Sequence, residues 1–189
     1  MIEVLAKDLR KPKYLHKIPN DKPGWYQWWA SIKALELLLN SPYISKKYMA
    51  DLFPLLHRRE YKGDYYYCIY TGIATKGSIR SRLNWHVNQH HTETAVRSGT
   101  LSTLRQTISS LIAGNQYDEF ATNELIDMLL VEYSAMNYQI KSAEAMSIIE
   151  QIEHDEQSKY ILPLNIKGNY HTAIQPFLQE LREVRKRSK

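Results

Sequence analysis

The chain has 189 residues, of which 43% are hydrophobic and 24% charged, and these values are typical of one globular domain with a buried core. The formal net charge of +5 favours an anionic partner, with nucleic acid as the first candidate. A single cysteine excludes an internal disulfide and a cysteine-rich zinc site. No stretch reaches the roughly 18 apolar residues of a membrane span. We therefore expect a cytoplasmic protein with no membrane partner.

Residues 1–22 are polar and carry several lysines and prolines, so we interpret them as a basic N-terminal arm. The aromatic-rich segment 25–30 is typical of a strand, and the apolar spacing over 31–39 predicts a helix. A second, shorter helix is expected over 46–56, followed by a charged turn. The clearest strand covers 65–71, where Cys68 should be a small buried side chain.

The next helix begins at Ser78, which is a typical N-cap residue. One stripe of this helix should face the core, because its apolar residues recur every four positions: Ile79, Leu83 and Val87. An adjacent stripe should lie along the border of the core: Arg82, His86 and His90. The helix therefore presents two cationic groups in one direction.

The second half of the chain alternates between helix and strand patterns. We expect helices over 102–114 and 142–158, a helical turn at 123–127, a strand over 128–136 and a final amphipathic helix over 176–187. This order of elements predicts an α+β fold in which a small sheet is flanked by helices.

Charged residues gather in three places, and each cluster is equally typical of a solvated surface. The two ends are basic: Lys7, Arg10, Lys11, Lys13 and Lys17 at the first, and Arg182, Arg185, Lys186, Arg187 and Lys189 at the second. The segment 144–156 carries only acids: Glu144, Glu150, Glu153, Asp155 and Glu156. Such a carboxylate cluster in a basic protein suits a cation held near a phosphate.

Five sequence features follow one another in a recognisable order. They are Gly24-Trp25-Tyr26, Tyr70-Thr71-Gly72, the Arg82-x-x-x-His86 spacing, the acidic helix, and Pro163-Leu164-Asn165. Together they resemble the GIY-YIG nuclease superfamily over roughly residues 23–169, and the layout is closest to its stand-alone members. The chain departs from the superfamily pattern at Trp25 and Thr71, which replace isoleucines, and in the longer gap between the two tyrosine motifs.

The resemblance implies a central three-stranded antiparallel sheet surrounded by helices, which fits segments 25–30, 65–71 and 128–136 as the strands. It implies a nuclease domain over 23–170. The remaining residues, 171–189, are then a basic amphipathic helix packed on the same domain.

The resemblance also implies an active site. By position it assigns the catalytic roles to five residues: Tyr26, Tyr70, Arg82, His86 and Asn165. The metal-binding glutamate should lie in the acidic helix and would hold Mg²⁺ or Mn²⁺. We choose Glu150 because it stands between isoleucines as in the superfamily, although Glu153 has the commoner spacing to Asn165 and Glu144 is a further alternative.

Each assignment has a plain structural alternative. The two tyrosines are also typical of packed strand residues, Arg82 of a surface ion pair, His86 of a helix face, and Asn165 of a turn after a helix. The hydroxyls and helix start near Ser102, Thr103 and Arg105 are our candidates for contacts with the DNA backbone.

The chemistry of these groups favours a metal-dependent DNA endonuclease that hydrolyses phosphodiester bonds. A cation polarises the phosphate, and an arginine fork binds its oxygens. Tyr26 would orient or deprotonate the attacking water, Tyr70 would hydrogen-bond the water or the phosphate, and His86 would relay the proton or position Tyr26.

Two other functions fit the sequence. One is a nucleic-acid-binding module with a decayed site, because two motif positions are substituted. The other is a small structural or zinc protein, since His86, His90 and His91 include a ligand spacing of four residues. The sequence is compatible with a monomer or a homodimer.

Overall fold

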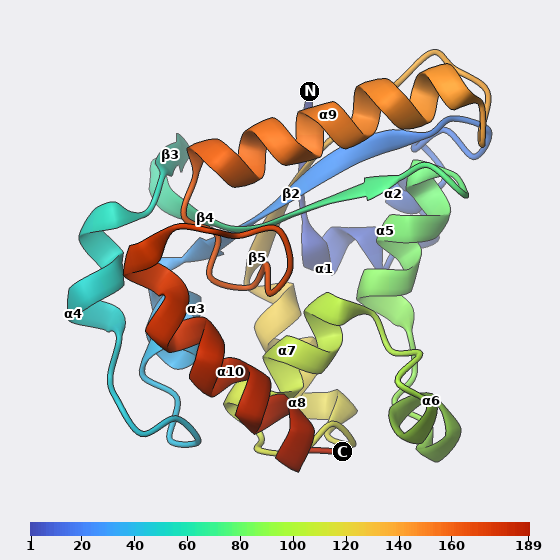
Figure 1. The fold of residues 1–189 in the computed structure, drawn as a ribbon. Helices are drawn as coiled ribbons and strands as arrows, with labels where there is room; N and C mark the ends of the chain where they lie inside the picture. Colours follow the sequence, from blue (N-terminus) through green and yellow to red (C-terminus); the bar gives the residue numbers. More distant parts are fainter.

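The computed structural model describes residues 1–189, and its centre is one antiparallel sheet (Figure 1). The strands lie side by side in the order β1-β5-β2-β4-β3. Their bounds are β1 Ile2–Leu5, β2 Gly24–Ser31, β3 Arg58–Tyr61, β4 Asp64–Ala74 and β5 Leu129–Ala135. The α+β class is therefore confirmed, but the sheet has five strands and not the expected three.

The two additional strands are the edges of the sheet. β3 pairs with β4 through a two-residue turn in which Lys62 and Gly63 both have positive φ, at 54° and 87°. This backbone geometry matches the twist of a tight hairpin, so the charged segment that we interpreted as a turn is a hairpin strand. At the other edge, β1 pairs with β5 from Ile2 opposite Tyr133 to Leu5 opposite Leu130.

Residues 1–22 are not a separate arm. After β1 they form two short helices, α1 (Ala6–Leu9) and α2 (Pro12–Leu15), and three apolar side chains of this segment are buried: Ala6, Leu9 and Ile18. Arg10 donates hydrogen bonds to Asp127 at 2.6 Å and to Asn123 at 3.0 Å. The basic composition of residues 1–22 therefore gave no indication that this segment packs against the core.

The remaining helices occupy both faces of the sheet. They are α3 Ile32–Leu39, α4 Met49–Leu52, α5 Ile79–Asn88, α6 Glu93–Ser98, α7 Thr103–Ile112, α8 Glu119–Asp127, α9 Ala143–Lys159 and α10 Gln175–Arg187. α9 runs across one face, whereas α3, α7, α8 and α10 lie beyond the opposite face (Figure 1). The expected helix over 46–56 is only α4 and a 3₁₀ turn at Phe53–Leu55, because Pro54 cannot continue an α-helix.

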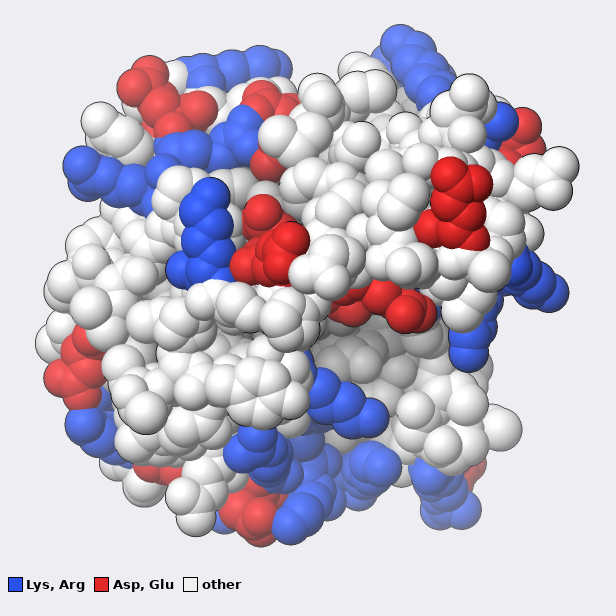
Figure 2. Space-filling view, turned by 45° about the horizontal axis from the view of Figure 1, so that its top comes forward, with Lys and Arg blue, Asp and Glu red and all other residues white.

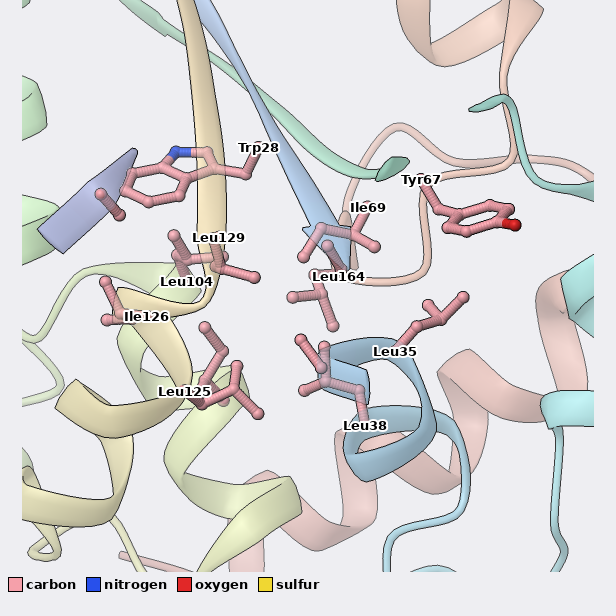
Figure 3. Close-up of a cluster of buried hydrophobic side chains, with 14 of the residues drawn as sticks. Trp28, Leu35, Leu38, Tyr67, Ile69, Leu104, Leu125, Ile126, Leu129 and Leu164 are labelled. Atoms are coloured by element: carbon pink, nitrogen blue, oxygen red, sulfur yellow. The ribbon is translucent and has the colours of Figure 1, made fainter. Parts of the chain in front are cut away.

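The main core lies on the face opposite α9. Figure 3 shows how side chains from α3, α7 and α8 meet Trp28 and Ile69 of the sheet and Leu164 of the segment after α9. The inner face of α10 joins the same core through buried apolar residues: Phe177, Leu178, Leu181 and Val184. A smaller cluster on the α9 face contains Cys68, which is buried as expected.

The pairing of β2 with β4 contains one irregularity. Trp28 is opposite Tyr70, but Trp29 is opposite Cys68, so Ile69 is an extra residue in β4. Such a bulge changes the alternation of side chains between the two faces. Ile69 and Tyr70 both pack against the main core, and Tyr70 consequently lies on the same face as Tyr26.

No helix of the structure is both long and apolar enough to span a bilayer.

Gly72 should be intolerant of a side chain, because it is opposite Tyr26 in the sheet. A Cβ atom there would lie 2.5 Å from the Tyr26 hydroxyl oxygen and 2.7 Å from Cζ. We expect Gly72→Ala to lower the free energy of unfolding by about 1–3 kcal/mol, since the buried ring must move. In Gly77→Ala the new atom meets only the Ser81 hydroxyl at 3.3 Å, and this control should stay close to wild type. Urea denaturation measures both, and equal stabilities of the two variants would contradict the prediction.

Candidate active site

A buried tyrosine–histidine pair lies where α5 packs against the sheet. The Tyr26 hydroxyl and Nε2 of His86 are 2.7 Å apart, and the two side chains are 2% and 1% exposed. β2 provides Tyr26, and α5 provides His86 in its last turn. The N-cap Ser78, whose hydroxyl accepts a hydrogen bond from the Ser81 amide, fixes the start of α5 and hence the position of His86.

Burial keeps both partners neutral, and neighbouring cations also oppose a positive charge on His86. Burial lowers the pKa of His86 well below its usual value, and the guanidinium groups of Arg82 and Arg105 lower it further. Burial also raises the pKa of Tyr26 well above 10. A neutral phenol therefore faces a neutral imidazole, and one hydrogen bond joins them.

Tyr70 lies beside this pair and reaches a cleft. Its ring centroid is 6.4 Å from that of Tyr26 and 6.1 Å from that of His86. Burial and the carboxylate of Glu153 raise the pKa of Tyr70 to about 12, although Arg82 and Arg185 act in the opposite direction. Tyr70 thus connects the buried pair to solvent.

Arg82 lies on the half-buried side of α5, and its guanidinium carbon is 4.8 Å from the centre of the Trp85 ring. It has no carboxylate within 4 Å, so the alternative of a surface ion pair does not hold. It lines a hollow of about 340 Å³, and Trp85 separates this hollow from the larger cleft. An unpaired guanidinium at the mouth of a site is a ready ligand for a phosphate.

The larger cleft measures about 780 Å³ and contains one carboxylate, that of Glu153 on α9. Burial raises the pKa of Glu153, the negative charge of Glu150 acts in the same direction, and Arg82 opposes both. Glu150 is exposed and does not line the cleft, and Glu144 is an exposed residue in the first turn of α9. The structure therefore brings Glu153 to Tyr70, and it leaves our first choice, Glu150, outside the cleft.

Asn165 holds the segment after α9 against β4. Its amide oxygen accepts a hydrogen bond of 2.8 Å from the backbone N–H of Thr71, and its amide nitrogen donates one of 3.0 Å to the Thr71 carbonyl. Next to it, Leu164 donates its N–H to the carbonyl of the bulge residue Ile69 at 2.9 Å. Both polar ends of the Asn165 side chain are occupied, so the structure supports a positioning role beside the cleft.

The three residues expected to contact DNA differ in their exposure and in their contacts. Thr103 is exposed and lines the cleft, whereas Ser102 is buried and caps α7. Arg105 is 0% exposed, and its guanidinium donates hydrogen bonds to His91, Asn123 and the carbonyl oxygens of α5. Arg105 is therefore a structural residue, and its assignment as a DNA contact is wrong.

The histidines do not form a zinc site. His90 is exposed and pairs with Glu119 at 3.0 Å, while His91 is buried and bonded to Arg105 and to the Gln116 carbonyl. No group of three or more His, Cys, Asp or Glu side chains converges as a set of metal ligands. The spacing of four residues between His86 and His90 thus has a structural explanation.

A comparison with family models agrees with this geometry. The model described as the GIY-YIG catalytic domain matches residues 24–187. This range includes β2, Tyr26 and Tyr70, Arg82 and His86 of α5, and α10. The chain belongs to the GIY-YIG family. Neither the curated proteins nor the solved structures contain a match. Membership of this family implies nuclease activity in general.

Some of the residues that line the cleft of this GIY-YIG domain could be predicted from the sequence, and others could not. The helical spacing places Glu153 on the same stripe as Ala145 and Ile149, which are the buried residues of α9. This signal, together with the spacing to Asn165, could have identified Glu153. Trp85 and Arg185 also line the cleft, but nothing in their local sequence distinguishes them from other helix residues.

The neutral His86 of the GIY-YIG domain gives folding a pH dependence. Because the pKa of His86 is lowered in the folded state, the unfolded chain binds the extra proton first as the pH falls below about 6.5. The free energy of unfolding should therefore decrease from pH 7.5 to pH 5, and His57 and His91, whose pKa values are also lowered, should add to the slope. His86→Gln should reduce that slope by up to about 1.4 kcal/mol per pH unit.

The matched control is His16→Gln, which removes an exposed imidazole. Urea denaturation at several pH values measures all three proteins. An unchanged slope in His86→Gln would show that this imidazole is charged in the folded protein.

Proposed function

We propose that this GIY-YIG domain is a divalent-metal-dependent DNA endonuclease that hydrolyses phosphodiester bonds. In this proposal Arg82, Tyr26, Tyr70 and His86 act on the phosphate and the attacking water, and Glu153 binds the metal ion. Glu153 takes the place of Glu150, which was the first choice from the sequence.

One observation carries the proposal. Tyr26 of β2, Tyr70 of β4 and His86 of α5 lie together, with ring centroids 5.2–6.4 Å apart, and Tyr70 shares the cleft with Glu153 of α9. Burial shifts the pKa of all four groups, and the charge of Arg82 acts on each of them. Perturbed groups that converge on a cleft are typical of catalytic sites, and the family match supports that interpretation here.

The donor set fits a hydrated divalent cation. Glu153 is a single half-buried carboxylate in an open polar cleft, and Mg²⁺ commonly binds one or two carboxylates while it keeps several waters. A cation bound there would polarise the phosphate and stabilise the leaving oxygen. Its charge would also favour the ionised form of Glu153, which burial disfavours in the free protein.

The arginine and the tyrosines act on the phosphate and the water. Arg82 has a free planar fork that can bind two phosphate oxygens, and its position over Trp85 limits its freedom. Tyr70 lines the cleft and can hydrogen-bond the water or the phosphate. Tyr26, whose ring centroid is 6.4 Å from that of Tyr70, would orient the attacking water, or take its proton while the Tyr26 hydroxyl proton passes to His86.

His86 provides a place for the proton. In the free protein, burial and two guanidinium groups oppose protonation of its ring. A phosphate that binds to Arg82 would cancel part of that positive charge, so the imidazole would become more basic when substrate is present. The hydrogen bond of 2.7 Å then allows a proton to pass from Tyr26 to His86.

Substitutions of the two glutamates of α9, Glu150 and Glu153, should have very different effects on cleavage activity. Glu153→Gln removes the carboxylate in the cleft and should reduce Mg²⁺-dependent cleavage of supercoiled plasmid by about 10²-fold or more. Glu150→Gln removes an exposed carboxylate and should stay within about threefold of wild type. EDTA should stop cleavage by the wild type. A loss in Glu150→Gln with full activity in Glu153→Gln would reverse the assignment.

Two further variants test the phosphate and proton roles. Arg82→Ala should lower the cleavage rate by about 10²–10³, and Tyr26→Phe should lower it by about 10²–10⁴ because it removes only the hydroxyl bound to His86. The controls are Arg97→Ala on α6 and Tyr65→Phe, an exposed residue near the start of β4, and both should cut normally. Wild-type protein that binds DNA but never cuts it would favour a binding module with a decayed site.

A further inference from the structure

The cleft beyond Tyr70 has walls of opposite charge. α9 contributes Glu153 to one wall, and the other is formed by α10 and the segment before it, with Arg185 and Lys167. A second hollow of about 270 Å³ continues from Arg185 past Arg182, Lys186 and Lys189. Figure 2 shows this arrangement as a recess with acidic side chains along one rim and basic side chains along the other.

Arg185 is held in a defined orientation within this wall. One of its terminal nitrogens donates a hydrogen bond to the Gln106 amide oxygen. The Gln106 nitrogen donates in turn to the carbonyls of Gly99 at 3.0 Å and Leu101 at 2.6 Å, so the amide cannot rotate without losing both bonds. Gln106 is itself buried. The guanidinium therefore points into the cleft from a fixed support.

No carboxylate neutralises this guanidinium. Arg185 is half-buried, and its only hydrogen-bonded side-chain partner is the neutral amide of Gln106, which leaves most of its five N–H donors free. Burial lowers the pKa of Arg185 accordingly. A partly desolvated cation without a counter-ion is unfavourable, and an anion that enters the cleft removes the penalty. Lys167, Arg182 and Lys189 also lack carboxylate partners within 4 Å, which makes this surface more attractive to an anion.

We infer that Arg185 binds a backbone phosphate of the DNA strand next to the scissile phosphate. Arg82 and Arg185 line two hollows that share Trp85, Tyr70 lines the hollow of Arg185, and the charges of both guanidinium groups act on Tyr70. A strand that places its scissile phosphate at Arg82 would cross Tyr70 and present a neighbouring phosphate to Arg185. The inference depends on the proposed function, because it names a further contact with the same substrate.

The test compares two arginines of the same helix. Binding of a fluorescein-labelled DNA duplex is measured by anisotropy in EDTA, where no cleavage occurs, over a series of salt concentrations. Arg185→Gln should raise the Kd roughly tenfold and reduce the slope of log K against log salt by about 0.9, the value for one lost phosphate contact. Arg187→Gln removes the same charge two residues away, where the side chain lines a different hollow, and should change the Kd less than about twofold.

Two additional variants separate binding from folding. Arg185→Lys keeps the charge without the fork and should recover part of the affinity. Thr103→Glu places a negative charge on the exposed rim of the cleft at the first residue of α7, where a carboxylate favours the helix, so this variant should fold normally and still bind DNA roughly tenfold more weakly.

The outcomes distinguish this inference from the proposed function. The role of Arg185 alone would be overturned by the following result. The wild-type protein binds and cuts DNA, Arg185→Gln and Arg187→Gln have the same Kd and salt slope, and Thr103→Glu binds DNA as tightly as the wild type. Wild-type protein that neither binds nor cuts DNA would remove the proposed function and this inference together.

Discussion

The extra residue in β4 is the constraint on which the site depends. If β4 alternated regularly from Cys68, Tyr70 would lie on the α9 face, behind the sheet and away from Tyr26. The bulge at Ile69 turns Tyr70 to the face of Tyr26, and Gly72 two residues later leaves room for the Tyr26 hydroxyl. The same irregularity frees a backbone carbonyl at Ile69, which accepts a hydrogen bond from Leu164. One local change in register therefore places two phenols together and creates a docking point for the segment after α9.

Electrostatics then decide how these groups behave. Arg82 and Arg105 both oppose a positive charge on His86, but only Arg82 can be neutralised by substrate, because Arg105 is fully buried behind α5. In the proposed mechanism, Arg105 would set a constant background, and Arg82 would provide the part that changes when a phosphate binds. A buried arginine without access to the substrate would then still influence the site. The free and substrate-bound forms would differ in the basicity of His86 and not only in occupancy.

The sequence was sufficient for features that depend on local spacing. Ser78 as a cap and the apolar residues every four positions in α5 predicted the helix that carries Arg82 and His86, and these elements formed as expected. Long-range features were missed for physical reasons. β1 is too short for a clear pattern and becomes a strand only because β5 offers it an open edge. The bulge at Ile69 leaves no signal in a run of aromatic and apolar residues, and the burial of Arg105 depends on partners from α5 and α8.

Asn165 shows how one side chain can position both walls of the cleft. The segment that it anchors lies between α9, which carries Glu153, and α10, which carries Arg185. Because the amide bonds both the N–H and the carbonyl of Thr71, the segment is fixed in distance and orientation next to Tyr70. These two hydrogen bonds, of 2.8 Å and 3.0 Å, therefore fix the segment that joins the acidic wall to the basic wall beside the same tyrosine. An asparagine is well suited to this task, since it offers a donor and an acceptor on one planar group without adding a charge to the site.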